Sequence, residues 1–191
     1  MTAIVLLAAG ESRRMGQPKQ LLDFKGVPLL RHVALTALAV GPVIVVLGAR
    51  ADSLRFALDG IPVEIVVNEQ WEAGMGASIQ TGLRLLEGRG DVTGAILALA
   101  DQPFVTAEFF ARLIAEHVRS GKGIVAASYG GTVGVPAYFS RAAFPHLMAL
   151  PAGQGCKGVI LAQVDDRVLF ECPEAELDLD TPEDYRAALQ A

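Results

Sequence analysis

The residues best suited to chemistry form a loop near the start of the chain. Leu7 to Lys19 reads LAAGESRRMGQPK and combines two glycines with the cations Arg14 and Lys19. Glycine lets the backbone turn tightly, consecutive main-chain N–H groups can form a nest for an anion, and the two cations add charge for a polyphosphate. The loop is neither the GxGxxG nor the GxxxxGK[ST] phosphate motif. On charge and glycine alone, a solvated basic loop is an equally good interpretation.

Aspartates with metal-binding chemistry stand at two later positions. Asp101 directly follows the apolar run 95–100, at the point where a buried strand would deliver a carboxylate to a ligand crevice. Mg²⁺ prefers one or two carboxylates together with substrate phosphates. Asp178 and Asp180 alternate around Leu179, so an extended segment would turn both to one side. Either could complete a metal site with Asp101, and the spacing does not choose between them. Without a metal, Asp101 could simply form a turn, and Asp178 and Asp180 could provide favourable charge at a helix N-terminus.

A third candidate site contains polar side chains without charge. Asn68 follows the apolar run 63–67 and could read the edge of a base, and Ser78 lies in a glycine-rich turn, GMGASI, that leads into a helix. A turn and a helix cap explain the same residues without any ligand. Trp71 between them is interpreted as packing.

Strands and helices alternate along the chain and must position these residues. The apolar runs predict strands at 3–8, 43–47, 63–67, 95–100, 124–128, 135–139 and 167–170. The segments between them predict helices at 28–40, 51–58, 77–86, 106–119, 141–150, 157–163 and 181–189. Strands that are apolar throughout and alternate with helices indicate a mostly parallel sheet covered on both faces, with 135–139 antiparallel. Ligands bind beyond the carboxyl ends of such strands, where the candidate residues stand.

Composition excludes several classes of protein. The chain has 191 residues, 52% of them hydrophobic, and no linker, repeat or low-complexity segment divides it, so we expect a single domain over 1–191. No apolar run approaches the roughly 20 residues that span a bilayer. The net charge of −5 without a basic stripe argues against a nucleic-acid partner. Two cysteines make no disulfide framework, and the first apolar stretch lacks the basic start of a signal peptide, so we expect a cytoplasmic protein.

The order of these motifs is more specific than any one of them. Leu7 to Lys19 resembles LxxGxSxRMGxxK, the signature of sugar-phosphate and cofactor nucleotidyltransferases. Later stretches matching NxxWxxGMxxS, ADQP, GVP and LDLDTPED resemble the branch that handles molybdenum cofactor. From Ile4 to about Tyr185 the chain is similar to the MobA-like nucleotidyltransferase family. Its Ala8-Ala9 pair resembles the LAAG of molybdenum cofactor cytidylyltransferases more than the LAGG of guanylyltransferases.

This resemblance implies a single-domain, Rossmann-like, three-layer α/β sandwich. It also implies a Mg²⁺-dependent transfer of CMP from CTP to molybdopterin-type molybdenum cofactor, with release of pyrophosphate and with a molybdenum enzyme as recipient of the product. The implied catalytic residues are Arg14, Lys19 and Asp101, and the implied metal ligands are Asp101 and Asp180. The implied nucleotide-binding residues are Leu7, Ala8, Ala9, Gly10, Ser12, Arg14, Met15, Gly16, Lys19, Asn68 and Ser78.

The chain departs from the family pattern on the side of the acceptor. Relatives often carry PxGDxGAR where residues 151–158 read PAGQGCKG, so Gln154 replaces the acid and Cys156-Lys157 replaces Ala-Arg. Lysine keeps the charge of arginine but loses its bidentate recognition of phosphate. Three alternatives therefore stay open: a guanylyltransferase that uses GTP, a transferase for a sugar or alcohol phosphate, and a non-catalytic chaperone that binds the cofactor.

Overall fold

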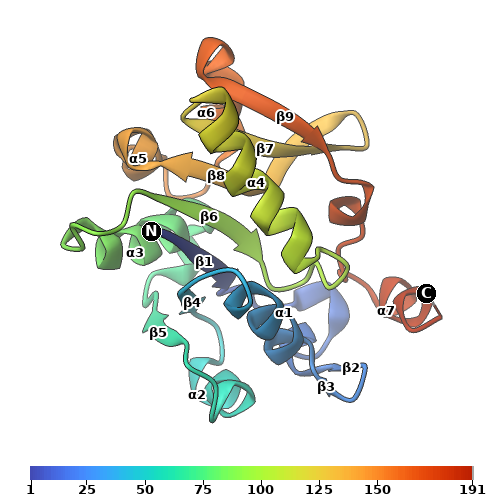
Figure 1. Cartoon of the computed structure of the whole chain (residues 1–191). Coiled ribbons are helices and arrows are strands. Elements are labelled where there is room, and N and C mark those ends of the chain that lie inside the picture. The colour runs from blue at the N-terminus through green and yellow to red at the C-terminus, as the bar shows by residue number, and fades with distance from the viewer. Residues whose placement is uncertain (191) are drawn as a thin grey trace.

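A seven-stranded sheet forms the centre of the computed structural model, which describes residues 1–190 (Figure 1). Ala191, the last residue of the expected domain 1–191, lies outside the described residues. The strand order is β5-β4-β1-β6-β8-β7-β9. The strands are β1 (Thr2–Ala8), β4 (Val43–Leu47), β5 (Glu64–Val67), β6 (Gly94–Leu99), β7 (Ile124–Tyr129), β8 (Thr132–Ser140) and β9 (Arg167–Glu171).

All neighbouring strands are parallel except those that pair with β8, which runs antiparallel to both β6 and β7. The predicted mostly parallel sheet with one reversed strand is therefore confirmed. Gly130 and Gly131 connect β7 to β8, and both have positive φ. A two-residue hairpin needs this conformation at both positions, and glycine adopts it without strain.

Helices cover both faces of the sheet and make the predicted three layers. The face shown towards the viewer in Figure 1 carries α1 and α4. The helices are α1 (Leu29–Leu38), α2 (Ala51–Arg55), α3 (Met75–Glu87), α4 (Ala107–Ser120), α5 (Phe144–Met148), α6 (Lys157–Ala162) and α7 (Pro182–Ala188). Residues of α1, α2, α4 and α7 belong to one buried cluster, whereas residues of α3, α5 and α6 belong to the other.

The two buried clusters explain why the strands are apolar throughout. Along β1, Ile4 and Leu6 enter the cluster with α1, whereas Val5 and Leu7 enter the cluster with α3. Each strand must therefore be apolar at successive positions, because both of its faces are buried. Gly82 of α3 faces Val5 so closely that a Cβ there would clash with the valine side chain. The absent side chain lets α3 lie directly on β1.

Each predicted helix differs from the observed helix by one to three residues at one or both ends. The helix predicted at 28–40 begins at Leu29, because Pro28 pairs with Asp23 in a small unpredicted hairpin of β2 (Asp23–Phe24) and β3 (Val27–Pro28). The segment 51–58 is an α-helix only to Arg55 and then a 3-10 turn, and 141–150 also begins as a 3-10 turn. Side chains cap two of the helices: Thr106 accepts a bond from Phe109 N, and Thr181 forms a capping box with Asp184.

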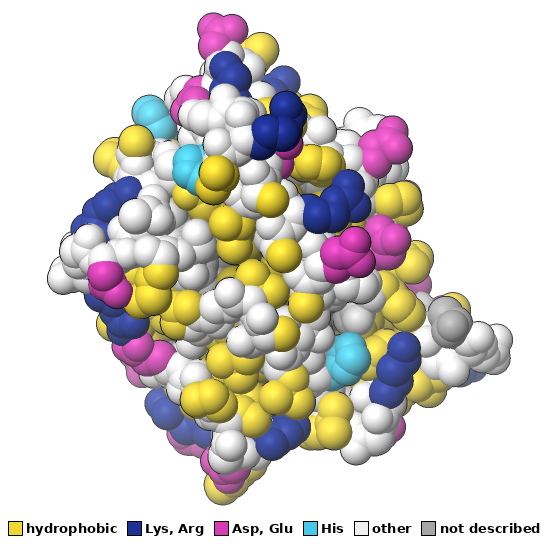
Figure 2. Space-filling model, in the orientation of Figure 1, with side chains coloured by type: hydrophobic (Ala, Val, Ile, Leu, Met, Phe, Trp, Pro, Cys, Tyr) yellow, Lys and Arg dark blue, Asp and Glu magenta, His cyan; other side chains and the backbone are white. Residues whose placement is uncertain are grey.

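The surface over α1 and α4 is mainly apolar at its centre. Figure 2 shows hydrophobic side chains in the middle of this face and most of the charged ones around its rim. A shallow groove between the two helices is lined by Ala39, Val40, Ala107, Glu108, Ala111 and Ile114. Within residues 1–190, no helix has the length and apolar character needed to cross a membrane.

Truncation of a core side chain on α4 should test this packing. Phe110 is fully buried between α4 and the sheet, so Phe110→Ala should lower the free energy of unfolding by about 3–5 kcal/mol. Val118 on the same helix is 75% exposed, and Val118→Ala should change stability by no more than about 0.5 kcal/mol. Urea denaturation at equilibrium measures both values. Equal losses in the two variants would contradict the layer assignment of α4.

Candidate active site

The loop after β1 is held in place by one buried glutamine. Gln20 donates through Nε2 to the carbonyl oxygens of Ala8 (3.3 Å) and Gly10 (2.9 Å), and its Oε1 accepts a bond from Ser12 Oγ (3.1 Å). The same Ser12 hydroxyl accepts a bond from Lys19 N. The glutamine and serine side chains therefore fix the two ends of the loop against each other.

The Lys19 ammonium bridges two carboxylates from distant parts of the sequence. It forms ion pairs with Asp101 Oδ2, at the end of β6, and with Asp180 Oδ1 (2.7 Å), just before α7. Burial alone would lower the pKa of Lys19, but the charges and hydrogen bonds of the two aspartates raise it above its ordinary value. Lys19 is therefore a fixed cation at neutral pH. The structure thus brings together three of the predicted site residues.

Arg14 extends this cluster towards solvent. Its guanidinium lies 2.5 Å from Asp180 Oδ2, so Asp180 contacts both cations. Burial opposes ionisation of Asp180, yet Lys19 and Arg14 together hold its pKa below the usual value. The Arg14 side chain is 72% exposed, which leaves it accessible to an incoming anion.

Asp178 and Asp180 are both partly buried and flank the buried Leu179. The N–H of Leu179 donates to Asp101 O at 3.1 Å. Burial and the nearby charge of Asp101 raise the pKa of Asp178 to about 6. The Oδ1 atoms of Asp101 and Asp178 are both buried without a hydrogen-bond donor.

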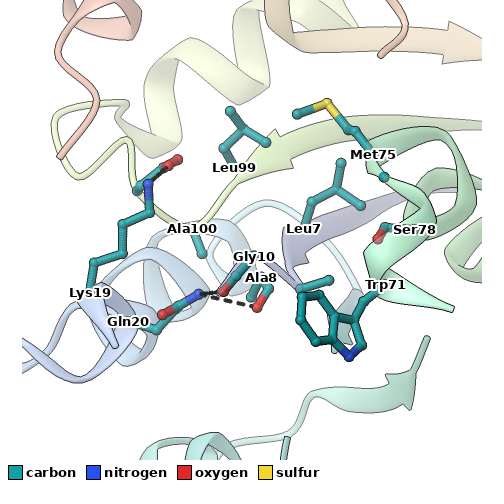
Figure 3. Close-up of a pocket in the computed structure, with 13 residues that line it drawn as sticks. Leu7, Ala8, Gly10, Lys19, Gln20, Trp71, Met75, Ser78, Leu99 and Ala100 are labelled. Atoms are coloured by element: carbon teal, nitrogen blue, oxygen red, sulfur yellow. Dashed lines mark hydrogen bonds and ion pairs between the residues drawn. The ribbon is translucent and has the colours of Figure 1, made fainter. Parts of the chain in front are cut away.

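A cavity of about 260 Å³ opens beside this cluster (Figure 3). Lys19 and Gln20 stand on one side of it, and Trp71, Met75 and Ser78 stand on the other. Seven of the predicted residues line this cavity, namely Leu7, Ala8, Ala9, Gly10, Lys19, Ser78 and Asp101.

A second groove of about 400 Å³ adjoins the first cavity. It contains the predicted residues Ser12, Arg14 and Asp180. Gly10, Lys19 and Trp71 line both spaces, so the cavity and the groove are continuous around them.

Three predicted residues stand behind the cavity. Met15 is buried beneath the loop, and Gly16 has a φ of 72° that closes the 3-10 turn of residues 13–15. Asn68 is buried, and its Nδ2 donates to Ser78 Oγ at 3.0 Å. Its Oδ1 accepts a bond from Gln70 N. In this geometry Asn68 orients Ser78 and the turn that carries Trp71.

Sequence reasoning missed six residues of the cavity wall, namely Gln20, Trp71, Gly74, Met75, Leu99 and Ala100. Trp71 was assigned to packing, but its indole lines both the cavity and the groove. Gln20 was not singled out, although it follows Lys19 directly. The available signal for Trp71 was its place three residues before the glycine-rich turn, on the edge where ligands bind.

The segment with the sequence departure packs against the start of α3. A Cβ on Gly74 would lie 2.7 Å from Gly153 Cα, and Ala77 N donates to Ala152 O at 3.2 Å. Lys157 instead faces another groove, of about 810 Å³, where its Nζ donates to Thr132 Oγ1 at 2.5 Å. That groove contains the β7–β8 turn and is separate from the cavity with Lys19.

Asp101 and Asp180 can bind a divalent cation only if a bound ligand supplies further oxygen atoms to it. Asp101 and Asp180 already share one cation, the Lys19 ammonium, and Asp101 Oδ1 is a buried acceptor without a donor. Throughout residues 1–190, no three His, Cys, Asp or Glu side chains gather closely enough to form a metal site by themselves. Mg²⁺ sites of this kind are completed by substrate phosphates.

A mostly parallel α/β sheet with a basic glycine loop and facing carboxylates at its carboxyl edge defines a nucleotidyltransferase fold and site. The MobA-like NTP transferase domain matches residues 4–168, and the chain belongs to this family. The predicted family and fold class are confirmed.

The curated relatives carry several different names. The chain is 31% identical to the purine catabolism protein PucB of Bacillus subtilis, over 95% of this chain and 92% of that protein. It is 36% identical to nicotine blue oxidoreductase of Paenarthrobacter nicotinovorans, over 78% and 70%. It is 32% identical to molybdenum cofactor guanylyltransferase of Rhodobacter capsulatus, over 96% and 93%. The family is therefore shown, whereas the names of these relatives point to different activities.

Solved structures share the whole fold. Rv0371c of Mycobacterium tuberculosis has a TM-score of 0.83 and 32% identity, covering 100% of this chain and 97% of that one. Its complex with manganese has a TM-score of 0.79 and 29% identity, covering 100% and 98%.

The raised pKa of Asp178 predicts a specific dependence of stability on pH. The folded protein holds this proton up to about pH 6, whereas the unfolded chain releases it near 3.8. The stabilisation from the neutral carboxyl is therefore complete below about pH 3.8 and disappears as the pH rises through 6. With a chelator present, urea denaturation should show Asp178→Asn gaining stability relative to wild type between pH 4 and 7.

Asp91→Asn, at an exposed position before β6, controls for the loss of one negative charge. A constant difference between wild type and Asp178→Asn across this pH range would contradict the burial of Asp178.

Proposed function

We propose that this protein transfers CMP from CTP to the terminal phosphate of a molybdopterin-type molybdenum cofactor in a Mg²⁺-dependent reaction that releases pyrophosphate. The observation that carries this proposal is the cluster of Lys19 and Arg14 with Asp101 and Asp180 at the mouth of the cavity. Fixed cations can hold a triphosphate there, while the facing carboxylates offer oxygen ligands to a cation bound with it. The family assignment supports nucleotidyl transfer.

The chemistry requires two anions to meet. An oxygen of the acceptor phosphate forms a bond to the α-phosphorus of CTP, and the bond from that phosphorus to the β-phosphate oxygen breaks. The nucleophile is already ionised near neutral pH, so the site needs no strong general base. Positioning and charge neutralisation by Lys19 and Arg14 then supply the catalysis. This role requires Lys19 to exchange a carboxylate oxygen for a phosphate oxygen when the nucleotide binds.

Asp101 and Asp180 would hold Mg²⁺ together with phosphate oxygens of the nucleotide. When bound, the cation neutralises charge on the triphosphate and on the leaving pyrophosphate. Asp180 pairs with both Lys19 and Arg14, whereas no ion pair joins Asp178 to either of them within residues 1–190, so Asp180 is the better candidate for the second ligand. The manganese complex of Rv0371c supports a divalent cation in this fold.

The choice of CTP rests on Ala9. Ala9 and Trp71 both line the cavity. Gly48 packs tightly against both of them: a Cβ on this glycine would lie 2.8 Å from the Ala9 methyl and 2.5 Å from Trp71 Cβ. If the base binds beside Ala9, the methyl group of this residue would leave less room there and would favour the smaller cytosine over a purine.

GTP is the second candidate donor, because the relative from Rhodobacter capsulatus is named a guanylyltransferase. The acceptor proposal also includes a molybdenum enzyme as recipient of the finished cofactor. This chain differs from the family pattern at Gln154, Cys156 and Lys157, which belong to the segment expected on the acceptor side.

Loss of one carboxylate should separate binding from turnover. Asp101→Asn keeps the shape of the side chain but removes its charge, and we expect the rate of pyrophosphate release to fall by about 100-fold or more. Emission from Trp71, the single tryptophan of the chain, reports nucleotide binding in the same variant. Asp91→Asn should retain the wild-type rate. Absence of pyrophosphate release from the wild type with CTP, GTP, ATP and UTP would refute the proposed function.

Removal of the Ala9 methyl should change the choice of base. Ala9→Gly should shift the ratio of kcat/KM for CTP and GTP towards GTP by about tenfold, since one methyl group in a tight pocket discriminates by this amount. Ala3→Gly, at the far end of the same strand, is the matched control. An unchanged ratio in Ala9→Gly would remove the argument for CTP.

A further inference from the structure

Gln102 is a buried polar residue that the proposed mechanism does not use. It follows Asp101 at the end of β6, and only 1% of its surface is exposed. Its Nε2 donates to Ala175 O at 2.8 Å and to Val135 O at 3.4 Å. Because Nε2 faces two carbonyl oxygens, the orientation of the amide is fixed. One side chain thus joins the end of β6 to β8 and to the segment before α7.

The segment that carries Asp178 and Asp180 depends on such anchors. Residues 177–180 are neither helix nor strand, so no ladder of main-chain bonds sets their position. Their described attachments near Asp101 are the Lys19 ammonium that pairs with both Asp180 and Asp101, the burial of Leu179, the bond from Leu179 N to Asp101 O, and the Gln102 bond to Ala175. Two of these attachments come from consecutive residues, Asp101 and Gln102. The position of Asp180 is therefore set relative to Asp101 by links that begin at Asp101 itself and at its neighbour.

Polar atoms around Gln102 indicate that this region is built for a ligand. Gln102 Oε1, Asp101 Oδ1 and Asp178 Oδ1 are all buried acceptors without a donor. Buried acceptors without partners are costly and need an explanation, which a purely structural glutamine does not provide.

We propose that Gln102 is a positioning residue that fixes the spacing between Asp101 and Asp180 and thereby sets the affinity of the site for a divalent cation bound with nucleotide. Within residues 1–190, Gln102 is not among the residues that line the cavity, and it reaches the segment 173–180 through its bond to Ala175 O. This inference rests on the proposed function, because it assumes that the two carboxylates hold a cation. Residues that orient metal ligands in this way change metal affinity by 10–100-fold when they are replaced.

Gln102→Met tests the proposal, because methionine fills a similar volume but donates no hydrogen bond. Mn²⁺ binding is followed by electron paramagnetic resonance in the presence of CTP and without acceptor, so the result does not depend on turnover. We expect Mn²⁺ to bind about tenfold more weakly or worse. The concentration of Mg²⁺ needed for half-maximal pyrophosphate release should rise by the same factor, while KM for CTP at saturating Mg²⁺ stays at the wild-type value.

The matched control is Gln80→Met. Gln80 of α3 also donates through Nε2 to two carbonyl oxygens, those of Met148 (3.1 Å) and Leu150 (2.8 Å), but it joins elements away from the carboxylates. This variant should lose stability and keep wild-type Mn²⁺ binding. Equal weakening of Mn²⁺ binding in the two variants would show a general effect of instability and would overturn the proposal.

Gln102→Asn covers the case in which the methionine variant does not fold. Asparagine keeps the amide but withdraws it by one methylene group, so Mn²⁺ binding should lie between wild type and Gln102→Met. Wild-type Mn²⁺ binding in folded Gln102→Met, or in Gln102→Asn if only that variant folds, overturns the positioning role. Absence of Mn²⁺ binding by the wild type with CTP also overturns it. If the wild type binds Mn²⁺ with CTP but releases no pyrophosphate with any nucleotide, only the proposed function fails.

Discussion

The contact of the Lys19 ammonium with Asp101 and Asp180 is the interaction on which the site depends. It joins the loop after β1, the end of β6 and the segment before α7, which lie 82 and 161 residues away from Lys19 along the chain. Without the lysine, two carboxylates would face each other in a partly buried place and repel. Without the carboxylates, a partly buried ammonium would be unpaired. The opposite charges therefore offset the cost of burying one another. When a nucleotide binds, its phosphates and the cation bound with them must replace these ion pairs.

The fold could be predicted from the sequence because its strands are apolar on both faces. Runs such as VIVVL at 43–47 have no polar face, and helices between them can only cover the two sides of a sheet. Helix ends were predicted well where a side chain makes the cap, as at Thr106 and Thr181. The hairpin of β2 and β3 was not predicted, because the pairing of Pro28 with Asp23 is a tertiary contact that the local sequence does not show.

The candidate site was predicted in part for the same reason. Lys19, Asp101 and Asp180 carry charges that stand out in an apolar chain, and parallel strands end at a common edge. Gln20 and Gln102 are uncharged, and their importance depends on carbonyl oxygens of residues far away in the chain. Trp71 could not be distinguished from a core residue, because an aromatic ring in a wall and one in a core have the same local sequence. No spacing rule specifies such contacts.

The reversed strand β8 has a consequence for how this framework can vary. Because β8 begins at the ligand edge and β7 ends there, the Gly130-Gly131 turn stands among the carboxyl ends of the parallel strands. The turn forms part of the groove that contains Lys157, whereas Asp101 lies at the end of the neighbouring strand β6. Residues inserted at this turn would project into solvent above the groove and leave the register of β6 with β8 unchanged. The molecule thus has one place where the shape of its surface can be remodelled while the carboxylates keep their positions.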